Sequence, residues 1–259
     1  MRQAHKKWFR GADVAAEVTS GSRNANASRA RDTSRPVRVR TMGLTVAATI
    51  VAIAGSNLTL AAPAHAAARA GSSSLAVFLD SPNDVGRGLV RKLIPGGAGL
   101  AGSTLSGLCG LTFPSDAARA ARLQVTFDRK GTKTAIASQE VVRYKTHHGS
   151  QARAQLLRAV TYCSTPQVLT NGQGDTETDV LHRFAAAHLP TGSIAITENV
   201  RRPATGPARF TYHAAYVYQF HGDVLSAVYS WQRNGISLVK AKSITVAAAQ
   251  VAHQLLLQH

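Results

Sequence analysis

The aromatic side chains best suited to bind a ligand lie in two alternating runs near the C-terminus. Residues 210–220 carry Phe, Tyr or Ala at every second position, and a turn at His221-Gly222 joins them to a second run that ends at Trp231. Alternate residues of a β-strand share one face, so the two runs predict a hairpin with an aromatic wall. The candidate binding residues on this wall are Tyr212, Tyr216, Tyr218, Tyr229 and Trp231.

Two interpretations of this wall stay open. In the first, the rings are the core face of a sheet that the C-terminal helix covers. In the second, part of the wall lines a cleft for a lipid, a glycan or another amphipathic ligand. Tyrosine suits a cleft because its ring offers apolar area while its hydroxyl orients the ligand. A dry core is more easily built from Phe or Leu, so the repeated tyrosines slightly favour the cleft interpretation.

The cysteines are the second group of residues with a chemical role, because they can form a disulfide. The chain has two, Cys109 and Cys163. An even cysteine count in an exported chain predicts a disulfide. Closing a loop of this length stabilises the fold by about 4 kcal/mol in the chain-entropy model.

The local sequence motifs do not indicate a catalytic site or a metal site. Gly97-Ala98-Gly99-Leu100-Ala101-Gly102 matches G-x-G-x-x-G, but it follows an expected helix end rather than a strand, so we expect no dinucleotide site. The G-x-S-x-G and H-E-x-x-H patterns are absent, and the histidines lack the spacing of metal ligands. We therefore expect no cofactor, no metal and no catalytic residues, although a triad assembled from distant positions stays open.

The first quarter of the chain predicts export. Residues 1–41 hold ten Lys or Arg and form a basic leader that cannot fold, and translation starting at Val37 or Val39 is an alternative. Residues 42–66 have the apolar stretch and the small-residue Ala-His-Ala end of a cleavable signal peptide, with a permanent membrane anchor as the alternative. Residues 67–259 then form one secreted domain. They keep 20 basic and 10 acidic residues, so the net charge falls from +17 to +10.

Helices and strands must position these side chains. A helix capped by Ser81 is expected to end before Pro95 and to bury Val85, Leu89 and Leu93. Ser150 is the expected N-cap of a helix over 151–162. Ser243 is the expected N-cap of a C-terminal helix whose apolar stripe is Ile244, Ala248, Val251 and Leu255.

Period-two alternation and β-branched residues predict strands over 123–127, 136–145, 180–184 and 193–200, besides the aromatic hairpin. Strands in adjacent hairpins, with helices before, between and after them, are typical of an α+β fold. The expected architecture is a twisted antiparallel sheet flanked by helices, with one disulfide.

Several segments resemble the extracellular sensor-like domain of mycobacterial receptor serine/threonine kinases and related actinobacterial secreted and lipoprotein domains. These segments are 79–86 (LDSPNDVG), Cys109, 139–144 (QEVVRY), 155–159 (QLLRA) and Cys163. The resemblance implies a compact α+β sensor or ligand-binding module with a disulfide, a cleft and no established catalysis. This chain differs from the kinases because no kinase domain accompanies the module, and it has one cysteine pair.

The sequence thus favours an exported, non-enzymatic sensor-like domain that binds a small or amphipathic ligand outside the cytoplasmic membrane. One alternative is a cell-envelope protein that binds anionic polymers through its positive charge. The other is an enzyme with a dispersed hydrolytic site. We expect no nucleic-acid partner, and membrane contact only through the signal segment, which would anchor the protein if it were not cleaved.

Overall fold

The computed structural model describes residues 74–100, 108–132, 134–170, 176–201, 211–232 and 236–259. The predicted basic leader, the signal peptide and its cleavage site lie outside the described residues. No helix within the described ranges combines the length and the apolar character that a membrane crossing needs.

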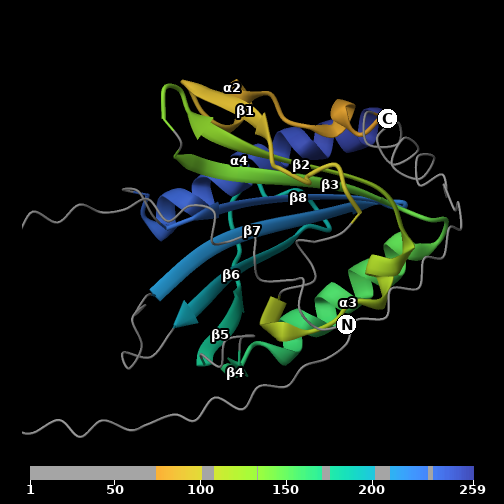
Figure 1. Cartoon of the computed structure of the whole chain (residues 1–259), viewed down its shortest axis with the longest axis vertical. Helices are drawn as coiled ribbons and strands as arrows, with labels where there is room; N and C mark the ends of the chain where they lie inside the picture. Colours follow the sequence, from red (N-terminus) through yellow and green to blue (C-terminus); the bar gives the residue numbers. More distant parts are fainter. Residues whose placement is uncertain (1–73, 101–107, 133, 171–175, 202–210, 233–235) are drawn as a thin grey trace, which may run out of the picture. The chain divides into compact units, whose positions relative to one another are not determined.

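One antiparallel sheet forms the centre of the domain (Figure 1). Its strands lie in the order β1-β2-β3-β8-β7-β6-β5-β4, so the first and fourth strands in sequence form its two edges. The bounds are β1 Leu89–Leu93, β2 Arg119–Arg129, β3 Ala135–Tyr144, β4 Gln167–Thr170, β5 Thr176–Arg183, β6 Ile194–Arg201, β7 Thr211–His221 and β8 Val224–Trp231.

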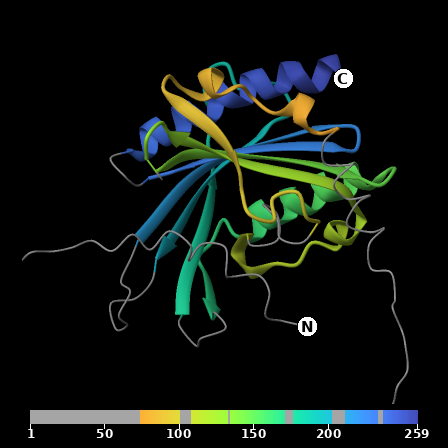
Figure 2. The same cartoon turned by 45° about the horizontal axis from the view of Figure 1, so that its top comes forward.

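Helices cover both faces of this sheet, as the tilted view shows (Figure 2). The long helix α4 (Leu238–Gln258) packs on one face, mainly over β7 and β8, together with the short helix α2 (Pro82–Val85). The helix α3 (His148–Tyr162) packs on the other face. The predicted α+β fold, with an antiparallel sheet flanked by helices and a disulfide, is confirmed.

The first predicted helix is shorter than expected. Ser81 caps α2 in a capping box with Asp84, as the sequence indicates, but α2 ends at Val85. The prediction that Leu89 and Leu93 continue the helix is wrong, because these residues form the edge strand β1. Gly88 takes a left-handed conformation with φ of 71°, which breaks the helix and turns the chain into the strand.

The aromatic hairpin forms as predicted, with the same residues on one face, but its turn is shifted by one residue. Gly222 and Asp223 form the two-residue turn, because His221 pairs with Val224. Gly222 supplies the positive φ, at 54°. Tyr218 lies opposite Ala227 and Tyr216 opposite Tyr229, so the two runs form one wall as predicted.

The caps of the two longer helices differ from those expected. Asp223, in the β7–β8 turn, accepts hydrogen bonds from the N–H groups of His147 and Gly149 and so caps α3 in place of Ser150. Ser237, rather than Ser243, caps α4 by accepting from the N–H of Lys240. The buried stripe of α4 continues from Ile244 and Ala248 to Ala252 and Leu256, whereas Val251 and Leu255, which were expected in it, are half-buried.

Candidate ligand-binding site on the tyrosine face

The five predicted binding residues come together on one face of the sheet. We call Tyr212, Tyr216, Tyr218, Tyr229 and Trp231 the tyrosine face. The Tyr216 ring stacks on those of Tyr218 and Tyr229, with centroids 6.0 and 5.5 Å apart. The Trp231 ring meets the edge of Tyr229 at 5.3 Å. Tyr212 is half-buried against the same cluster, and the other four rings are at most 6% exposed.

The tyrosine face lies on the side of α3, not on the side of the C-terminal helix. The rings belong to a buried core, as the first interpretation states, but α3 rather than the C-terminal helix covers them. Residues of the opposite parity on the same hairpin, Ala215 and Val228, contact the α4 side instead. Small side chains there allow the helix to approach the sheet closely. Parity shows which residues share a face, but it does not show which helix covers that face.

A cover of two segments encloses the tyrosine face. It consists of α3, which contributes Ala152, Leu156 and Val160, and the segment 108–118, which contributes Phe113. The predicted disulfide between Cys109 and Cys163 is present, and it ties this segment to the end of α3. The start of α3 is held to the sheet by Asp223. The cover is therefore fastened at both of its ends.

A buried carboxyl borders the tyrosine face on β6. The hydroxyl of Tyr216 donates a hydrogen bond to Oε2 of Glu198 at 2.5 Å. Burial raises the pKa of Glu198 to about 7, the Tyr216 hydrogen bond opposes this shift, and the nearby carboxylates Asp179 and Glu177 add to it. Burial also raises the pKa of Tyr216 well above its usual value. Glu198 therefore changes protonation near neutral pH.

Tyr218 is the most buried ring of the tyrosine face. Its side chain has no solvent exposure, and its hydroxyl has no hydrogen-bond partner among the described residues. Burial raises the Tyr218 pKa well above its usual value, so the hydroxyl stays neutral. A buried polar group without a partner costs about 1–3 kcal/mol. Phenylalanine would fill the same volume without that cost.

An ion pair borders the other side of the tyrosine face. Nε of Arg122 lies 2.5 Å from Oε1 of Glu140, and both side chains are buried. Gln124 accepts from Arg122 and donates to the hydroxyl of Tyr229. Sequence reasoning did not single out these polar residues. Their alternate spacing on β2 is the one available signal, and it does not show that they share a face with the tyrosines.

A second buried carboxyl lies on the opposite face, under α4. Asp80 is fully buried, and neither of its carboxyl oxygens has a hydrogen-bond partner among the described residues. Its backbone N–H donates to Oε1 of Gln139 at 2.8 Å. Burial, helped by the charge of Asp84 and opposed by Arg91, raises the pKa of Asp80 to about 8.

The glycine-rich segment has a packing role. It follows strand β1, so the expectation that it follows a helix end is wrong, and Gly102 lies outside the described residues. A Cβ on Gly97 would lie 2.5 Å from the carbonyl oxygen of Gln124. The N–H of Gln124 in turn donates to the carbonyl of Gly97. The glycine therefore lets this segment pack against β2.

Neither a serine–lysine pair nor a metal cluster adds a catalytic site within the described residues. Ser237 and Lys240 have S-x-x-K spacing, which sequence reasoning overlooked, but Ser237 acts as the N-cap of α4. No group of three or more His, Cys, Asp or Glu residues in the described ranges is arranged to hold a metal ion.

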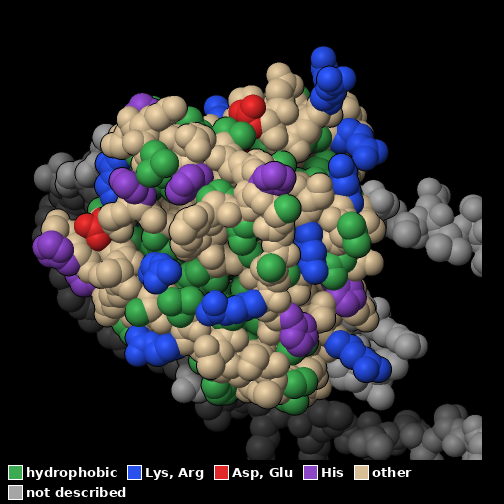
Figure 3. Space-filling model, turned by 180° about the vertical axis from the view of Figure 1, so that it is seen from behind, with side chains coloured by type: hydrophobic (Ala, Val, Ile, Leu, Met, Phe, Trp, Pro, Cys, Tyr) green, Lys and Arg blue, Asp and Glu red, His purple; other side chains and the backbone are tan. Residues whose placement is uncertain are grey.

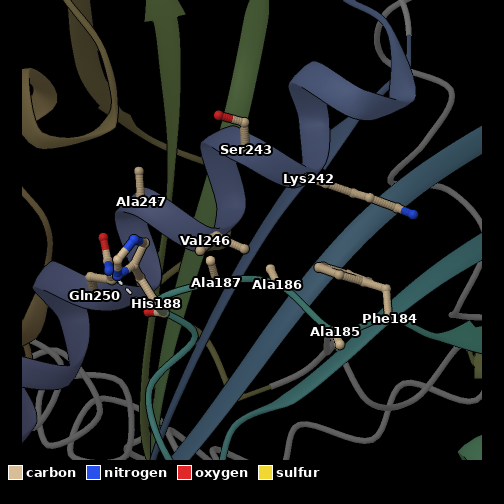
Figure 4. A pocket seen from close by; sticks show the side chains of 10 residues that line it. All are labelled: Phe184, Ala185, Ala186, Ala187, His188, Lys242, Ser243, Val246, Ala247 and Gln250. Atoms are coloured by element: carbon tan, nitrogen blue, oxygen red, sulfur yellow. Dashed lines mark hydrogen bonds between the residues drawn. The ribbon is translucent and has the colours of Figure 1, made fainter.

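An open groove lies on the outer side of α4, away from the tyrosine face (Figure 4). It has a volume of about 330 Å³ and lies between α4 and the start of the β5–β6 connection. Nζ of Lys242 lies 5.0 Å from the ring centroid of Phe184. Gln250 donates to the carbonyl of His188, which holds the connection to the helix. The rest of the wall is mostly alanine, with Ser243 as a further polar side chain.

Comparison with known proteins finds a weak structural similarity. No family model and no curated protein matches the chain. A solved structure, the extracellular domain of PknH from Mycobacterium tuberculosis, is similar with a TM-score of 0.43 and 14% identity. The match covers 73% of this chain and 95% of that one. Membership of the sensor-like domains stays a prediction.

Proposed function

We propose that this protein is an exported, non-enzymatic domain that binds an amphipathic ligand at the tyrosine face. The observation that carries the proposal is the buried hydroxyl of Tyr218, which has no partner among the described residues and lies next to the Tyr216–Glu198 pair. A ligand with a polar head could satisfy this hydroxyl while its apolar part replaces contacts of the cover.

The chemistry of the tyrosine face favours an uncharged polar head. Glu198 is buried with a pKa of about 7, so a ligand anion placed beside it would be repelled at neutral pH. Hydroxyl groups on a ligand could accept from Tyr218 and donate to Glu198. Stacked tyrosine rings suit the apolar part, because they present large rigid surfaces.

Binding requires the cover to move. Four rings of the tyrosine face are at most 6% exposed, and α3 packs directly on them. The disulfide and the Asp223 cap hold the two ends of α3, so its middle must shift or the 108–118 segment must turn aside. A conformational change of this kind leaves a clear signal in the fluorescence of the aromatic cluster.

Trp231 provides that signal. The chain has two tryptophans, so replacing Trp8 with Phe leaves Trp231 as the sole reporter, on the tyrosine face itself. We would titrate this full-length Trp8→Phe protein with monolaurin, an uncharged amphipath with two free hydroxyls. Saturable change in Trp231 fluorescence is the expected result. No change up to the solubility limit, together with no mass lost on denaturation of protein from its own host, would contradict the proposal.

Tyrosine variants locate the site. Tyr218→Phe removes the unpartnered hydroxyl and is expected to weaken monolaurin binding by about 2- to 10-fold, the value of one hydrogen bond. Tyr162→Phe is the matched control, because Tyr162 is 54% exposed on α3. Equal effects of the two variants would place the binding elsewhere.

The same titration separates binding from hydrolysis. A carboxyl with a pKa near 7, such as Glu198, is the kind of group that an enzyme with a dispersed site needs. Monolaurin is an ester, so hydrolysis would release laurate and glycerol. We expect intact monolaurin to be recovered. Laurate release that Glu198→Gln abolishes would establish the enzyme instead.

A further inference from the structure

Acidic and basic side chains are unequally divided between the interior and the surface. Six of the nine acidic residues in the described ranges are buried: Asp80, Asp128, Glu140, Glu177, Asp179 and Glu198. Asp84 is the one acidic residue of these ranges in the exposed class. Of the described Lys and Arg residues, all are exposed except Arg119, Arg122, Arg143 and Lys242. The surface is therefore more basic than the net charge indicates.

The view from behind agrees with this division (Figure 3). Lys and Arg side chains are spread over that face, and acidic side chains are few on it. A surface of this kind attracts anions over about 8–10 Å at physiological salt. A specific anion site would need several basic side chains held close together on this surface.

Five exposed basic residues lie close together at one edge of the sheet. We call Arg87, Arg91, Lys92, Arg129 and Lys130 the β1 corner. Leu89 pairs with Arg129, and the N–H of Lys130 donates to the carbonyl of Gly88, so the corner joins the edge strand β1 to the end of β2. All five side chains are exposed.

Two side chains of the β1 corner are positioned by the protein, and three have free charges. Arg91 donates to the carbonyl of Asp80 at 3.1 Å. Lys92 pairs with Asp128 at 2.9 Å while its side chain stays 48% exposed. Arg87, Arg129 and Lys130 make no ion pair within the described residues, so their charges are available to a partner.

The charges of the β1 corner point to both sides of the sheet edge. Arg91 has the parity of Phe127, which packs toward α4, whereas Lys92 lies on the side of Asp128. The strand β1, from Leu89 to Leu93, spans roughly 13 Å. A linear chain can follow this edge and contact both sides, whereas a flat membrane surface can contact one side.

We propose that the β1 corner binds a linear polyanion, a polymer with phosphate or carboxylate groups along its chain, outside the cytoplasmic membrane. This site is separate from the tyrosine face and does not depend on the proposed function. Charged residues also protect a sheet edge from pairing with another strand. That role needs charge at β1 but not the two basic residues at the end of β2, Arg129 and Lys130.

Lysine footprinting with long-chain inorganic polyphosphate tests the site directly. The full chain is acetylated with and without the polymer, and the modification of each lysine is read by mass spectrometry. Lys92 and Lys130 are expected to be protected at least threefold, whereas Lys145 and Lys240, which are also exposed, are not. Because the readout is residue by residue, polymer bound to the basic leader does not obscure it. Uniform protection, or none at the β1 corner, would overturn the proposal.

Charge-matched variants give a second, independent test. Arg129→Gln with Lys130→Gln removes two charges from the β1 corner, and Arg153→Gln with Arg158→Gln removes two exposed charges from α3. The first pair is expected to weaken polyphosphate binding about tenfold at low salt and to reduce the salt slope by about 1 to 2. The second pair is expected to change affinity less than twofold. Equal losses would show diffuse charge attraction instead of a site. Tighter binding to phosphatidylglycerol vesicles, lost in the same variant, would assign the β1 corner to a membrane.

Discussion

The two faces of the central sheet are packed by different means. Under α4, the hairpin offers Ala215, Val217 and Val228, and helix alanines such as Ala248 lie against them. Under α3, the same two strands offer stacked tyrosines and a tryptophan. One strand, β7, thus contributes small side chains to one face and large amphipathic ones to the other.

The difference indicates a division of roles. Close packing of small side chains gives a rigid support, although this face also buries the carboxyl of Asp80, which has no hydrogen-bond partner among the described residues. The α3 side buries a carboxyl, an ion pair and an unpartnered hydroxyl beneath a cover that a disulfide fastens. The unpartnered hydroxyl of Tyr218 lowers the stability of the ligand-free domain. We infer that the α4 face stabilises the domain and that the tyrosine face binds the ligand.

Removing the disulfide should have the largest effect. Cys109→Ala with Cys163→Ala opens a loop of 54 residues and is expected to lower the free energy of unfolding by about 4 kcal/mol. The loss follows from the greater freedom of the unfolded chain. Urea unfolding of the oxidised wild type and the variant measures it. A loss under 1 kcal/mol would show that the cover does not depend on this tether.

The buried carboxyls make stability depend on pH. Folding raises the pKa of Asp80 from near 4 to about 8, so the folded state binds this proton more tightly than the unfolded chain. The free energy of unfolding is therefore expected to fall as pH rises from about 4 to 8 and then to level off. Asp80→Asn should remove part of this fall, on the order of 3 kcal/mol. Urea midpoints at pH 5, 6.5 and 8 test it, and parallel curves for both proteins would contradict it.

Overpacking the α4 face should cost less. Ala248 is fully buried between α4 and the sheet, so Ala248→Leu is expected to destabilise the domain by about 1–3 kcal/mol. Ala247→Leu is the control, because Ala247 is exposed on the same helix and should change stability by less than about 0.5 kcal/mol. Thermal unfolding of both variants gives the comparison. If Ala248→Leu were as stable as the control, the close packing of this face would be disproved.

Removing the hydroxyl of Tyr216 and removing that of Tyr218 should change the free energy of unfolding in different directions. Tyr216→Phe leaves Glu198 without its donor and is expected to cost about 1–3 kcal/mol. Tyr218→Phe removes a hydroxyl without a described partner and is expected to leave stability unchanged or to raise it by up to about 1 kcal/mol. Urea unfolding of the two proteins without ligand decides between them. A loss for Tyr218→Phe equal to that for Tyr216→Phe would mean that its hydroxyl is bonded in the folded protein.

Local patterns predicted the parts of the fold that depend on neighbouring residues. The hairpin and its shared aromatic face follow from period two in Phe210–Trp231, and the capping box of α2 follows from Ser81 and Asp84. The helix over 81–93 failed because Val85, Leu89 and Leu93 fit a helical stripe as well as they fit two separate elements. The glycines at 86 and 88 were the signal for the break between them.

Contacts between residues far apart in the chain could not be predicted from the sequence. Asp223 caps α3 from more than 70 residues away, and no local pattern indicates this. The same holds for Glu198 and the Arg122–Glu140 pair, whose positions beside the tyrosines depend on strand order. Sequence parity predicted the tyrosine face correctly as a set of residues, yet which helix covers it depended on the topology.

Hydrogen exchange of α3 and α4, with and without monolaurin, tests the division of roles most directly. If the tyrosine face binds the ligand and the α4 face is the support, amide exchange in α3 and 108–118 should change on addition of monolaurin, while exchange in α4 should stay the same. Saturable monolaurin binding with an unchanged α3, or with the change confined to α4, would contradict the account.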